Sequence, residues 1–195
     1  MEIVNLSALI LLCIFWLTFM GRTVMLMASG VRVFVLAEGK TLAERLLEII
    51  LMPALLLWSL QIGFTSFGSP LIPAPLFWDV LMLQVAGLIL CAAGLVIFIF
   101  ALISFGNAWR VGIDDENSNR LVRDGIFAIS RNPIFLFMDI YFAGMFLVLP
   151  NWFFLAFFIF SAVGIHRQIL NEEKFLRGKF GAAYDDYTKK VRRYL

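Results

Sequence analysis

Five stretches of apolar residues, separated by polar connections, dominate the pattern of the chain. They cover residues 3–20, 46–64, 80–103, 134–149 and 152–165. A helix that crosses a bilayer core of about 30 Å needs about 20 apolar residues, so the first three stretches are long enough to span. The last two are shorter, and only Pro150 and Asn151 separate them. The pattern predicts that they form a tight helical hairpin, whose helices gain length by continuing into the flanking polar segments.

Composition supports a membrane environment for most of the chain. Of its 195 residues, 62% are hydrophobic and only 15% are charged, whereas soluble domains average about 25% charged residues. A soluble core of this size cannot bury so much apolar surface. We therefore expect an all-α integral membrane protein with five transmembrane helices, a cytoplasmic loop and a helical C-terminal tail.

The positions of lysine and arginine predict the orientation of these helices. All 16 lie in or beside the first connection, the third connection and the tail, and none lies in residues 65–79 or in the Pro150 turn. Because cytoplasmic flanks are enriched in basic residues, we expect an outside or lumenal N-terminus and a cytoplasmic C-terminus. We expect the last basic residues to attract anionic lipid headgroups rather than nucleic acid: Lys189, Lys190, Arg192 and Arg193.

The sequence changes character at residue 104. Residues 1–103 are interpreted as a scaffold of three membrane helices, the third of which carries small residues such as Gly87 and Gly94 that allow helices to approach closely. Residues 104–195 hold a polar loop, the hairpin 134–165 and the tail. We expect this second part to be the catalytic region, integrated with the scaffold into one domain.

Ionisable side chains gather at the membrane boundary of that region. The loop ends in Arg131-Asn132-Pro133, and Glu172-Glu173 follows the fifth apolar stretch. Proline suits the first turn of a helix, and the amide groups of a helix start favour an anion. Taken singly, however, Arg131 is explained as a basic cytoplasmic flank, and the glutamates as a solvated helix face paired with nearby cations.

Two further polar residues are candidates. Asp139 lies inside the fourth apolar stretch, where a carboxylate is either functional or paired with a buried cation. His166 is the only histidine of the chain, and we interpret it as an interfacial polar residue rather than a ligand. The two cysteines have no metal-ligand spacing, and we expect no metal.

Several motifs together resemble the isoprenylcysteine carboxyl methyltransferase family and its relatives among the membrane phospholipid methyltransferases. They are Gly106-Asn107-Ala108-Trp109, Arg120-Leu121-Val122-x-x-Gly125-Ile126-Phe127, Arg131-Asn132-Pro133-Ile134-Phe135, Glu172-Glu173-x-x-Leu176 and Phe180-Gly181-x-x-Tyr184-x-x-Tyr187. The resemblance covers about the last 90 residues. The chain departs from the family's pattern at Asn132, where the family has histidine, at Phe127 and Phe135, where it has tyrosine, and at Gln168, where it has arginine.

The resemblance implies methyl transfer from S-adenosylmethionine to the C-terminal carboxylate of a prenylated cysteine. It implies cofactor contacts from Asn119, Arg120, Leu121, Val122, Gly125, Phe127, Asn132, Pro133, Ile134, Phe135, Glu172 and Glu173. It also implies catalytic roles for Arg131, Arg167 and Glu172, with Arg167 and Gln168 at the substrate. A carboxylate is already ionised at neutral pH, so this reaction needs positioning and a dry site rather than a general base. The lipophilic substrate would enter from the bilayer.

Three alternatives remain open. A phospholipid-amine N-methyltransferase would need a proton acceptor for the amine. An enzyme resembling the membrane sterol reductases would bind a nicotinamide cofactor instead. A membrane scaffold without catalysis would need no glutamate pair at the boundary.

Overall fold

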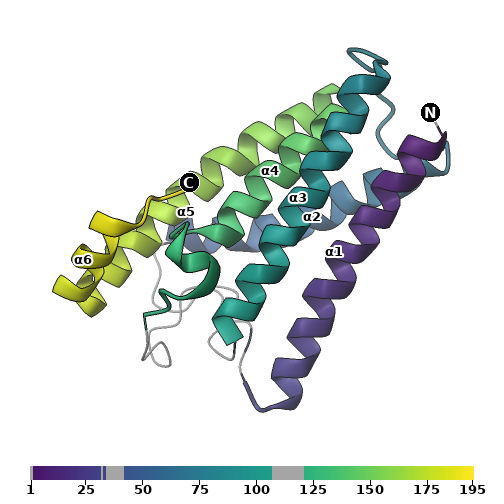
Figure 1. Cartoon of the computed structure of the whole chain (residues 1–195). Helices are drawn as coiled ribbons and strands as arrows, with labels where there is room; N and C mark the ends of the chain where they lie inside the picture. Colours follow the sequence, from purple (N-terminus) through teal and green to yellow (C-terminus); the bar gives the residue numbers. More distant parts are fainter. Residues whose placement is uncertain (1, 32, 34–41, 107–120) are drawn as a thin grey trace.

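The computed structural model describes residues 2–31, 33, 42–106 and 121–195, and these form a helical bundle (Figure 1). Its helices are α1 (Glu2–Ala28), α2 (Leu42–Ser66), α3 (Leu81–Phe105), α4 (Pro133–Val148), α5 (Trp152–Phe180) and α6 (Ala182–Lys190), with the short 3-10 helix η2 (Gly125–Ala128) before α4. Each of the five apolar stretches forms a helix. The prediction of an all-α fold is confirmed for the described residues.

The helices differ in their ability to cross a membrane. Among the described residues, three helices are long and apolar enough to do so, namely α1, α3 and α5. The apolar part of α2, Ile50–Ser66, and the 16-residue α4 are shorter. The predicted lengthening of the hairpin is therefore right for α5, which continues to Phe180, and wrong for α4, which begins at Pro133 and ends before Pro150.

Local sequence explains how the hairpin turns and ends. The Asn151 side chain accepts hydrogen bonds from the backbone N–H groups of Phe153 (3.0 Å) and Phe154 (3.2 Å), which caps the start of α5. At the other end of α5, Gly181 has a φ of 51°, which favours glycine and ends the helix. The turn that follows reverses the chain into α6.

Small residues bring α3 and α4 together. A Cβ atom added to Gly87 would lie 2.5 Å from the carbonyl oxygen of Gly144, and one added to Gly144 would lie 2.7 Å from the carbonyl oxygen of Gly87. Both distances are far below van der Waals contact, so only glycine fits at either position. The expected close approach of the third apolar helix is confirmed at Gly87.

Aromatic rings fill the interior around this contact. Trp58 of α2 is buried against Phe142 of α4 and Phe157 of α5, with ring centroids 5.1 and 5.5 Å away. Phe15 of α1 packs against Phe137 of α4 at 5.8 Å. Many apolar side chains instead face outward, including those of Leu17, Met82 and Ile103. Such an outer surface suits lipid rather than water.

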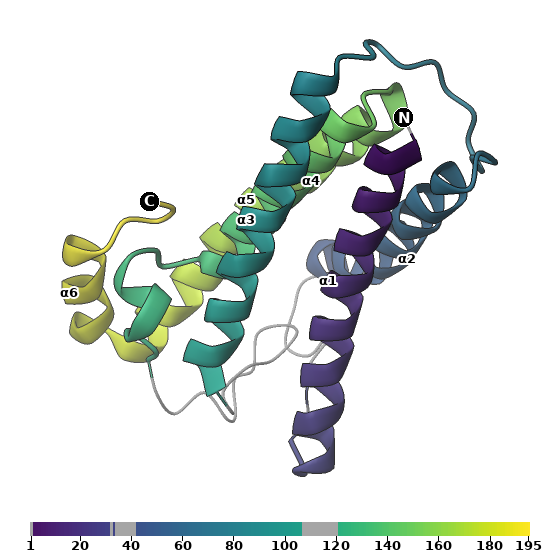
Figure 2. The ribbon, with the colours of Figure 1, turned by 45° about the vertical axis from the view of Figure 1, so that its right-hand side comes forward.

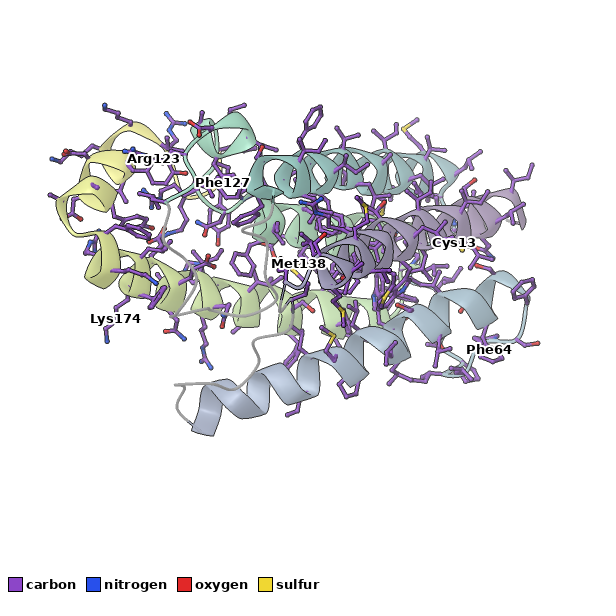
Figure 3. The ribbon with its side chains drawn as sticks, turned by 90° about the horizontal axis from the view of Figure 1, so that it is seen from below. Cys13, Phe64, Arg123, Phe127, Met138 and Lys174 are labelled. Carbon is purple, nitrogen blue, oxygen red and sulfur yellow. The ribbon has the colours of Figure 1, made fainter. Side chains whose placement is uncertain are left out.

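The described parts of the two kinds of connection lie at opposite ends of the bundle (Figures 1 and 2). At one end, the backbone N–H of Phe77 donates to the carbonyl oxygen of Pro150 at 2.7 Å, joining the two connections that lack basic residues. At the other end, Arg22 donates to the carbonyl oxygen of Gly106 at 2.6 Å. Figure 3 shows Arg123, Phe127 and Lys174 gathered at this second end, away from Cys13 and Phe64. The connections of the first end contain Asp79 but no lysine or arginine. We call the first the uncharged end, for its lack of basic residues, and the second the basic end.

Candidate active site

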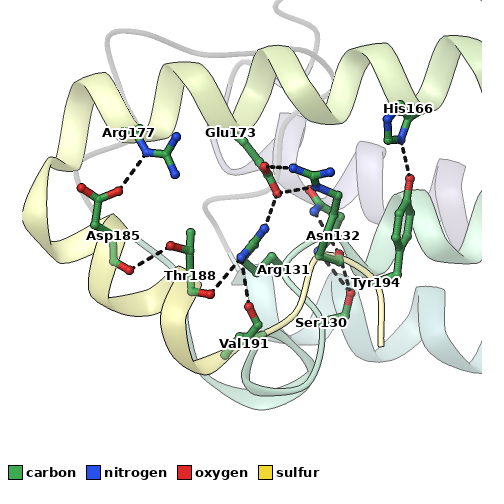
Figure 4. A network of polar contacts seen from close by, with 11 residues as sticks. Ser130, Arg131, Asn132, His166, Glu173, Arg177, Asp185, Thr188, Val191 and Tyr194 are labelled. Atoms are coloured by element: carbon green, nitrogen blue, oxygen red, sulfur yellow. Dashed lines mark hydrogen bonds and ion pairs between the residues drawn. The ribbon is translucent and has the colours of Figure 1, made fainter.

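A buried carboxylate organises the basic end (Figure 4). Glu173 of α5 is only 9% exposed. Its Oε1 accepts hydrogen bonds from Arg131 Nη2 at 2.7 Å and from Arg193 Nε at 3.1 Å, and its Oε2 accepts from Arg193 Nη2 at 2.8 Å. Hydrogen bonds between ionised groups are stronger than neutral ones. The hydrogen bond with Glu173 correspondingly raises the pKa of Arg193. We call these three residues the glutamate node.

Arg131 also holds the C-terminal tail. Its Nη1 donates to the carbonyl oxygens of Thr188 (3.2 Å) and Val191 (3.0 Å), and its backbone N–H donates to that of Arg192 at 3.0 Å. Its buried Nε has no hydrogen-bond partner among the described residues. Arg131 therefore has a structural task, and one cationic donor remains for a ligand.

Asn132 performs a similar anchoring task at the start of α4. It is 6% exposed, and its Nδ2 donates to the carbonyl oxygen of Arg193 at 3.1 Å. The Ser130 hydroxyl accepts from the backbone N–H of Asn132 at 3.2 Å and donates to the same Arg193 carbonyl at 3.4 Å. The asparagine that replaces the histidine of the resembled motif thus binds the tail.

The tyrosines of the tail dock α6 against η2. The Tyr187 hydroxyl donates to the carbonyl oxygen of Phe127 at 2.6 Å, and the Phe127 ring packs on that of Phe105 at 4.6 Å. Tyr184 and Tyr187 form a buried cluster with Val191, against which Leu121 packs. Burial raises the pKa of each tyrosine to about 12. Both hydroxyls therefore stay protonated at neutral pH, and Tyr187 remains a donor.

The structure brings only some of the predicted site residues together. Arg131 and Glu173 meet in the glutamate node, and Asn132 binds the backbone of Arg193 beside it. Arg167 is exposed and Gln168 half-buried on α5, one turn before Glu172. Glu172 is itself half-buried. Asn119 and Arg120 lie outside the described residues.

The remaining predicted contacts differ in how accessible they are. Phe127 and Pro133 are buried by the protein itself. Gly125 is exposed, and the position where a Cβ atom would lie is next to the Ser104 side chain. The partly exposed apolar positions are Leu121, Val122, Ile134 and Phe135. These four are the ones of the predicted set that can still offer an apolar surface to a ligand.

Sequence reasoning missed Arg193. The sequence groups it with the basic tail residues that are expected to attract lipid headgroups; in the structure its side chain, which is 35% exposed, binds Glu173. For Glu173, the expected cationic partners are neighbours along α5 such as Arg177, but Arg177 pairs with Asp185 at 2.8 Å. No spacing rule along the sequence links residues 173 and 193, because the turn at Gly181 sets the return of the tail.

A family model described as phospholipid methyltransferase matches residues 82–183, just over half of the chain. The chain belongs to the phospholipid methyltransferase family. The match runs from α3 to the start of α6 and so includes Arg131 and Glu173, but it ends before Tyr184, Tyr187 and Arg193. Neither the search of curated proteins nor that of solved structures found a match.

Methyltransferases of this family use S-adenosylmethionine, and the donors at the basic end fit that cofactor. Its amino acid part carries one carboxylate and one ammonium. The unpartnered Nε of Arg131 suits the carboxylate, and the half-buried carboxylate of Glu172 suits the ammonium. Leu121 and Val122, both half-exposed, offer apolar contact to adenine and ribose.

Proposed function

We propose that this protein is an S-adenosylmethionine-dependent methyltransferase that modifies a lipid substrate taken from the bilayer. The observation that carries the proposal is the glutamate node. Inside the region that the family model matches, the ion pair of Arg131 with Glu173 joins the start of α4 to α5. The ion pair of Arg193 with Glu173 also joins the C-terminal tail to α5. It lies at the end of helices whose outer surfaces are apolar. A site so placed has access to water on one side and to lipid on the other.

The proposed topology has five membrane crossings with the basic end in the cytoplasm. Its support is the segregation of the uncharged and basic connections to opposite ends of the bundle. The 16-residue α4, and α2, whose apolar part is short, would cross by packing against their neighbours. The charged cofactor would then bind from the cytoplasmic side.

Within this proposal, Arg131 and Glu172 hold the amino acid part of the cofactor. Bound S-adenosylmethionine supplies a methyl group on a positively charged sulfur. Leu121, Val122, Ile134 and Phe135 form the apolar wall, and the glutamate node keeps the tail docked beside them. The residues of this chain supply positioning and exclusion of water.

For the methyl acceptor we propose a phospholipid amine. Its support is the family match together with Asp139, whose buried Oδ1 has no hydrogen-bond partner among the described residues. An amine must lose a proton to react, and a carboxylate can take it. A carboxylate acceptor would instead need a second cation besides Arg131, which this proposal assigns to the cofactor, and Arg193 is already bound to Glu173.

The carboxylate of a prenylated cysteine is the second candidate acceptor. One observation favours it: Arg167 is exposed on α5 one turn before Glu172, where its guanidinium can orient a carboxylate. This was the acceptor implied by the motifs of the sequence.

Two measurements test the proposal. Purified protein in detergent is titrated with S-adenosylhomocysteine in a calorimeter, and we expect binding. Radiolabelled methyl transfer is then measured to phosphatidylethanolamine and to N-acetyl-farnesylcysteine. We expect transfer to phosphatidylethanolamine. Transfer to N-acetyl-farnesylcysteine alone would show that the acceptor is the carboxylate of a prenylated cysteine and not a lipid amine. Binding of a nicotinamide dinucleotide without binding of S-adenosylhomocysteine would overturn the methyltransferase proposal itself.

A further inference from the structure

A carboxylate lies between helices in the apolar part of the bundle. Asp139 follows the start of α4 at Pro133 by six residues, a rise of about 9 Å along the helix. Its Oδ1 is buried, without a hydrogen-bond partner among the described residues. Leaving a buried carboxylate oxygen unpartnered is costly. A partner from outside the described chain would remove that cost.

A second unpartnered polar group faces it from α5. Phe142 and Phe157 contact each other with ring centroids 5.1 Å apart, which sets the register of the antiparallel pair α4 and α5. Asp139 lies three residues before Phe142, and Ser161 lies four residues after Phe157. Residues three or four apart share a helix face. Both polar side chains therefore lie on the facing surfaces of α4 and α5, about one turn nearer the basic end.

Ser161 is the more deeply buried of the two. It is 2% exposed, and its Oγ has no hydrogen-bond partner among the described residues. A helical serine commonly bonds to the carbonyl of the preceding turn, as Ser59 does to Leu55 at 2.8 Å. Among the described residues, the Ser161 hydroxyl therefore has no partner, and the helix register places it at the same level of the bundle as Asp139.

The tail borders this site on the side of the basic end. The Tyr194 hydroxyl lies 3.0 Å from His166 Nδ1 (Figure 4), and Tyr194 packs against the main apolar cluster. Burial first, and then the negative charge of Asp139, raise the pKa of Tyr194. Tyr194 is thus close enough to Asp139 to respond to its charge. His166 is exposed, so the site is bordered on this side by a polar group at the surface of the protein.

We propose that Asp139 and Ser161 bind the ammonium nitrogen of the amine lipid, and that Asp139 accepts the proton which this nitrogen must lose. This proposal rests on the proposed function. One N–H bond breaks, its electron pair stays on nitrogen, and the proton goes to the Asp139 carboxylate. An ammonium with several N–H donors can serve both the carboxylate and the serine hydroxyl. A carboxylate acceptor would instead be repelled by Asp139.

Lipid binding without cofactor tests this directly. Binding of short-chain phosphatidylethanolamine and phosphatidylglycerol to the purified protein is measured by calorimetry. We expect the wild type to prefer the amine lipid by at least about tenfold, and Asp139→Asn to lose that preference. Ser161→Ala should weaken binding of the amine lipid by several-fold. The control is Asp186→Asn, which removes an exposed carboxylate paired with Lys189 at 2.9 Å, and which should change nothing.

Thermal unfolding in lipid-free detergent separates a binding role from a structural one. Because the buried Oδ1 of Asp139 has no hydrogen-bond partner among the described residues, Asp139→Asn should unfold at the same temperature as the wild type or higher. Addition of phosphatidylethanolamine should stabilise the wild type more than phosphatidylglycerol does, and the two lipids should stabilise Asp139→Asn equally. A lowered unfolding temperature of Asp139→Asn without lipid would overturn the inference, and so would an unchanged lipid preference.

The same samples distinguish this failure from failure of the proposed function. Asp139→Asn should still bind S-adenosylhomocysteine as the wild type does. If the wild type binds S-adenosylhomocysteine and Asp139→Asn keeps the amine preference, only the site assignment is wrong. If the wild type binds no S-adenosylhomocysteine, the proposed function fails as well.

Discussion

The two ends of the bundle are held together by different kinds of contact. At the uncharged end, Phe77 bonds to the Pro150 carbonyl and stacks edge-on against Trp152 at 4.8 Å. Gln61 exchanges two hydrogen bonds of 2.9 Å with the backbone of Ile72. At the basic end, Glu173 joins two arginines instead.

This difference separates a scaffold from a site. Each neutral contact contributes modestly to the free energy of unfolding, and its loss leaves no unpaired charge. The glutamate node contains a negative charge between two positive charges, so removal of the glutamate leaves both arginines facing each other without it. The uncharged end therefore tolerates change, whereas the basic end depends on a few residues far apart in the sequence.

The largest effect is expected from Glu173→Gln, which breaks the node. Glutamine keeps the shape but loses the charge that holds Arg131 and Arg193. We expect the free energy of unfolding of the tail region to fall by roughly 3 kcal/mol, near the low end for buried pairs, because Arg193 is 35% exposed. Hydrogen exchange of residues 182–195 should rise strongly, and S-adenosylhomocysteine binding should be lost.

The matched control for that change is Asp186→Asn on α6. Asp186 pairs with Lys189 at the surface, where ion pairs contribute little. The hydrogen exchange of the tail and the affinity for S-adenosylhomocysteine should equal those of the wild type. Equal behaviour of Glu173→Gln and Asp186→Asn would contradict the view that the node holds the tail.

Alkaline pH should loosen the basic end next. Burial raises the pKa of Tyr184 and Tyr187 to about 12, against about 10 in an unfolded chain. A raised pKa stabilises the folded state fully below the unfolded value, and that stability is lost as pH rises through the folded value. We expect the tail to stay docked up to pH about 10 and to undock between about 10 and 12. Tyrosinate absorbance measures the deprotonation of the tyrosines, and hydrogen exchange measures the undocking of the tail.

Tyr187→Phe sharpens this pH test. It removes the hydroxyl that donates to Phe127 at 2.6 Å together with one titrating group. The variant should be less stable at neutral pH and less sensitive to alkali. The same increase in hydrogen exchange of the tail between pH about 10 and about 12 in both proteins would contradict this explanation.

A smaller and purely structural effect is expected at the uncharged end. Asn151→Ala removes the cap that accepts two backbone N–H groups at the start of α5. Loss of such a cap costs about 1 kcal/mol. The unfolding temperature should fall, while S-adenosylhomocysteine binding should stay as in the wild type. A loss of binding would show that the two ends are coupled.

The smallest change is expected from Asn132→His, which restores the residue of the resembled motif. An imidazole N–H can donate to the Arg193 carbonyl in place of the asparagine amide. We expect the affinity for S-adenosylhomocysteine to change by less than about tenfold, or about 1.4 kcal/mol. A folded variant without binding would show that the asparagine has a role of its own.

Much of the scaffold could be predicted from the sequence. The five apolar stretches mark the helices because apolar runs report burial in protein or lipid. Asn151 and Gly181 mark the ends of α5 because both act locally, Asn151 through its capping side chain and Gly181 through its positive φ. The length of α4 was mispredicted because Pro133 and Pro150 bound it on both sides.

The site was less predictable because it depends on tertiary contacts. The motifs identified Arg131 and Glu173, but not their mutual bond across 42 positions. The role of Arg193 depends on the turn at Gly181 and on the docking of two tyrosines, neither of which a charge pattern reveals. The facing position of Ser161 opposite Asp139 becomes visible only once Phe142 and Phe157 set the helix register.

Titration with S-adenosylhomocysteine tests the central claim most directly. Wild-type protein, Asn151→Ala and Glu173→Gln are compared under one set of conditions in detergent. The account predicts binding to the wild type and to Asn151→Ala, and none to Glu173→Gln. Absence of binding to folded wild-type protein would contradict the assignment of the basic end as a methyltransferase site.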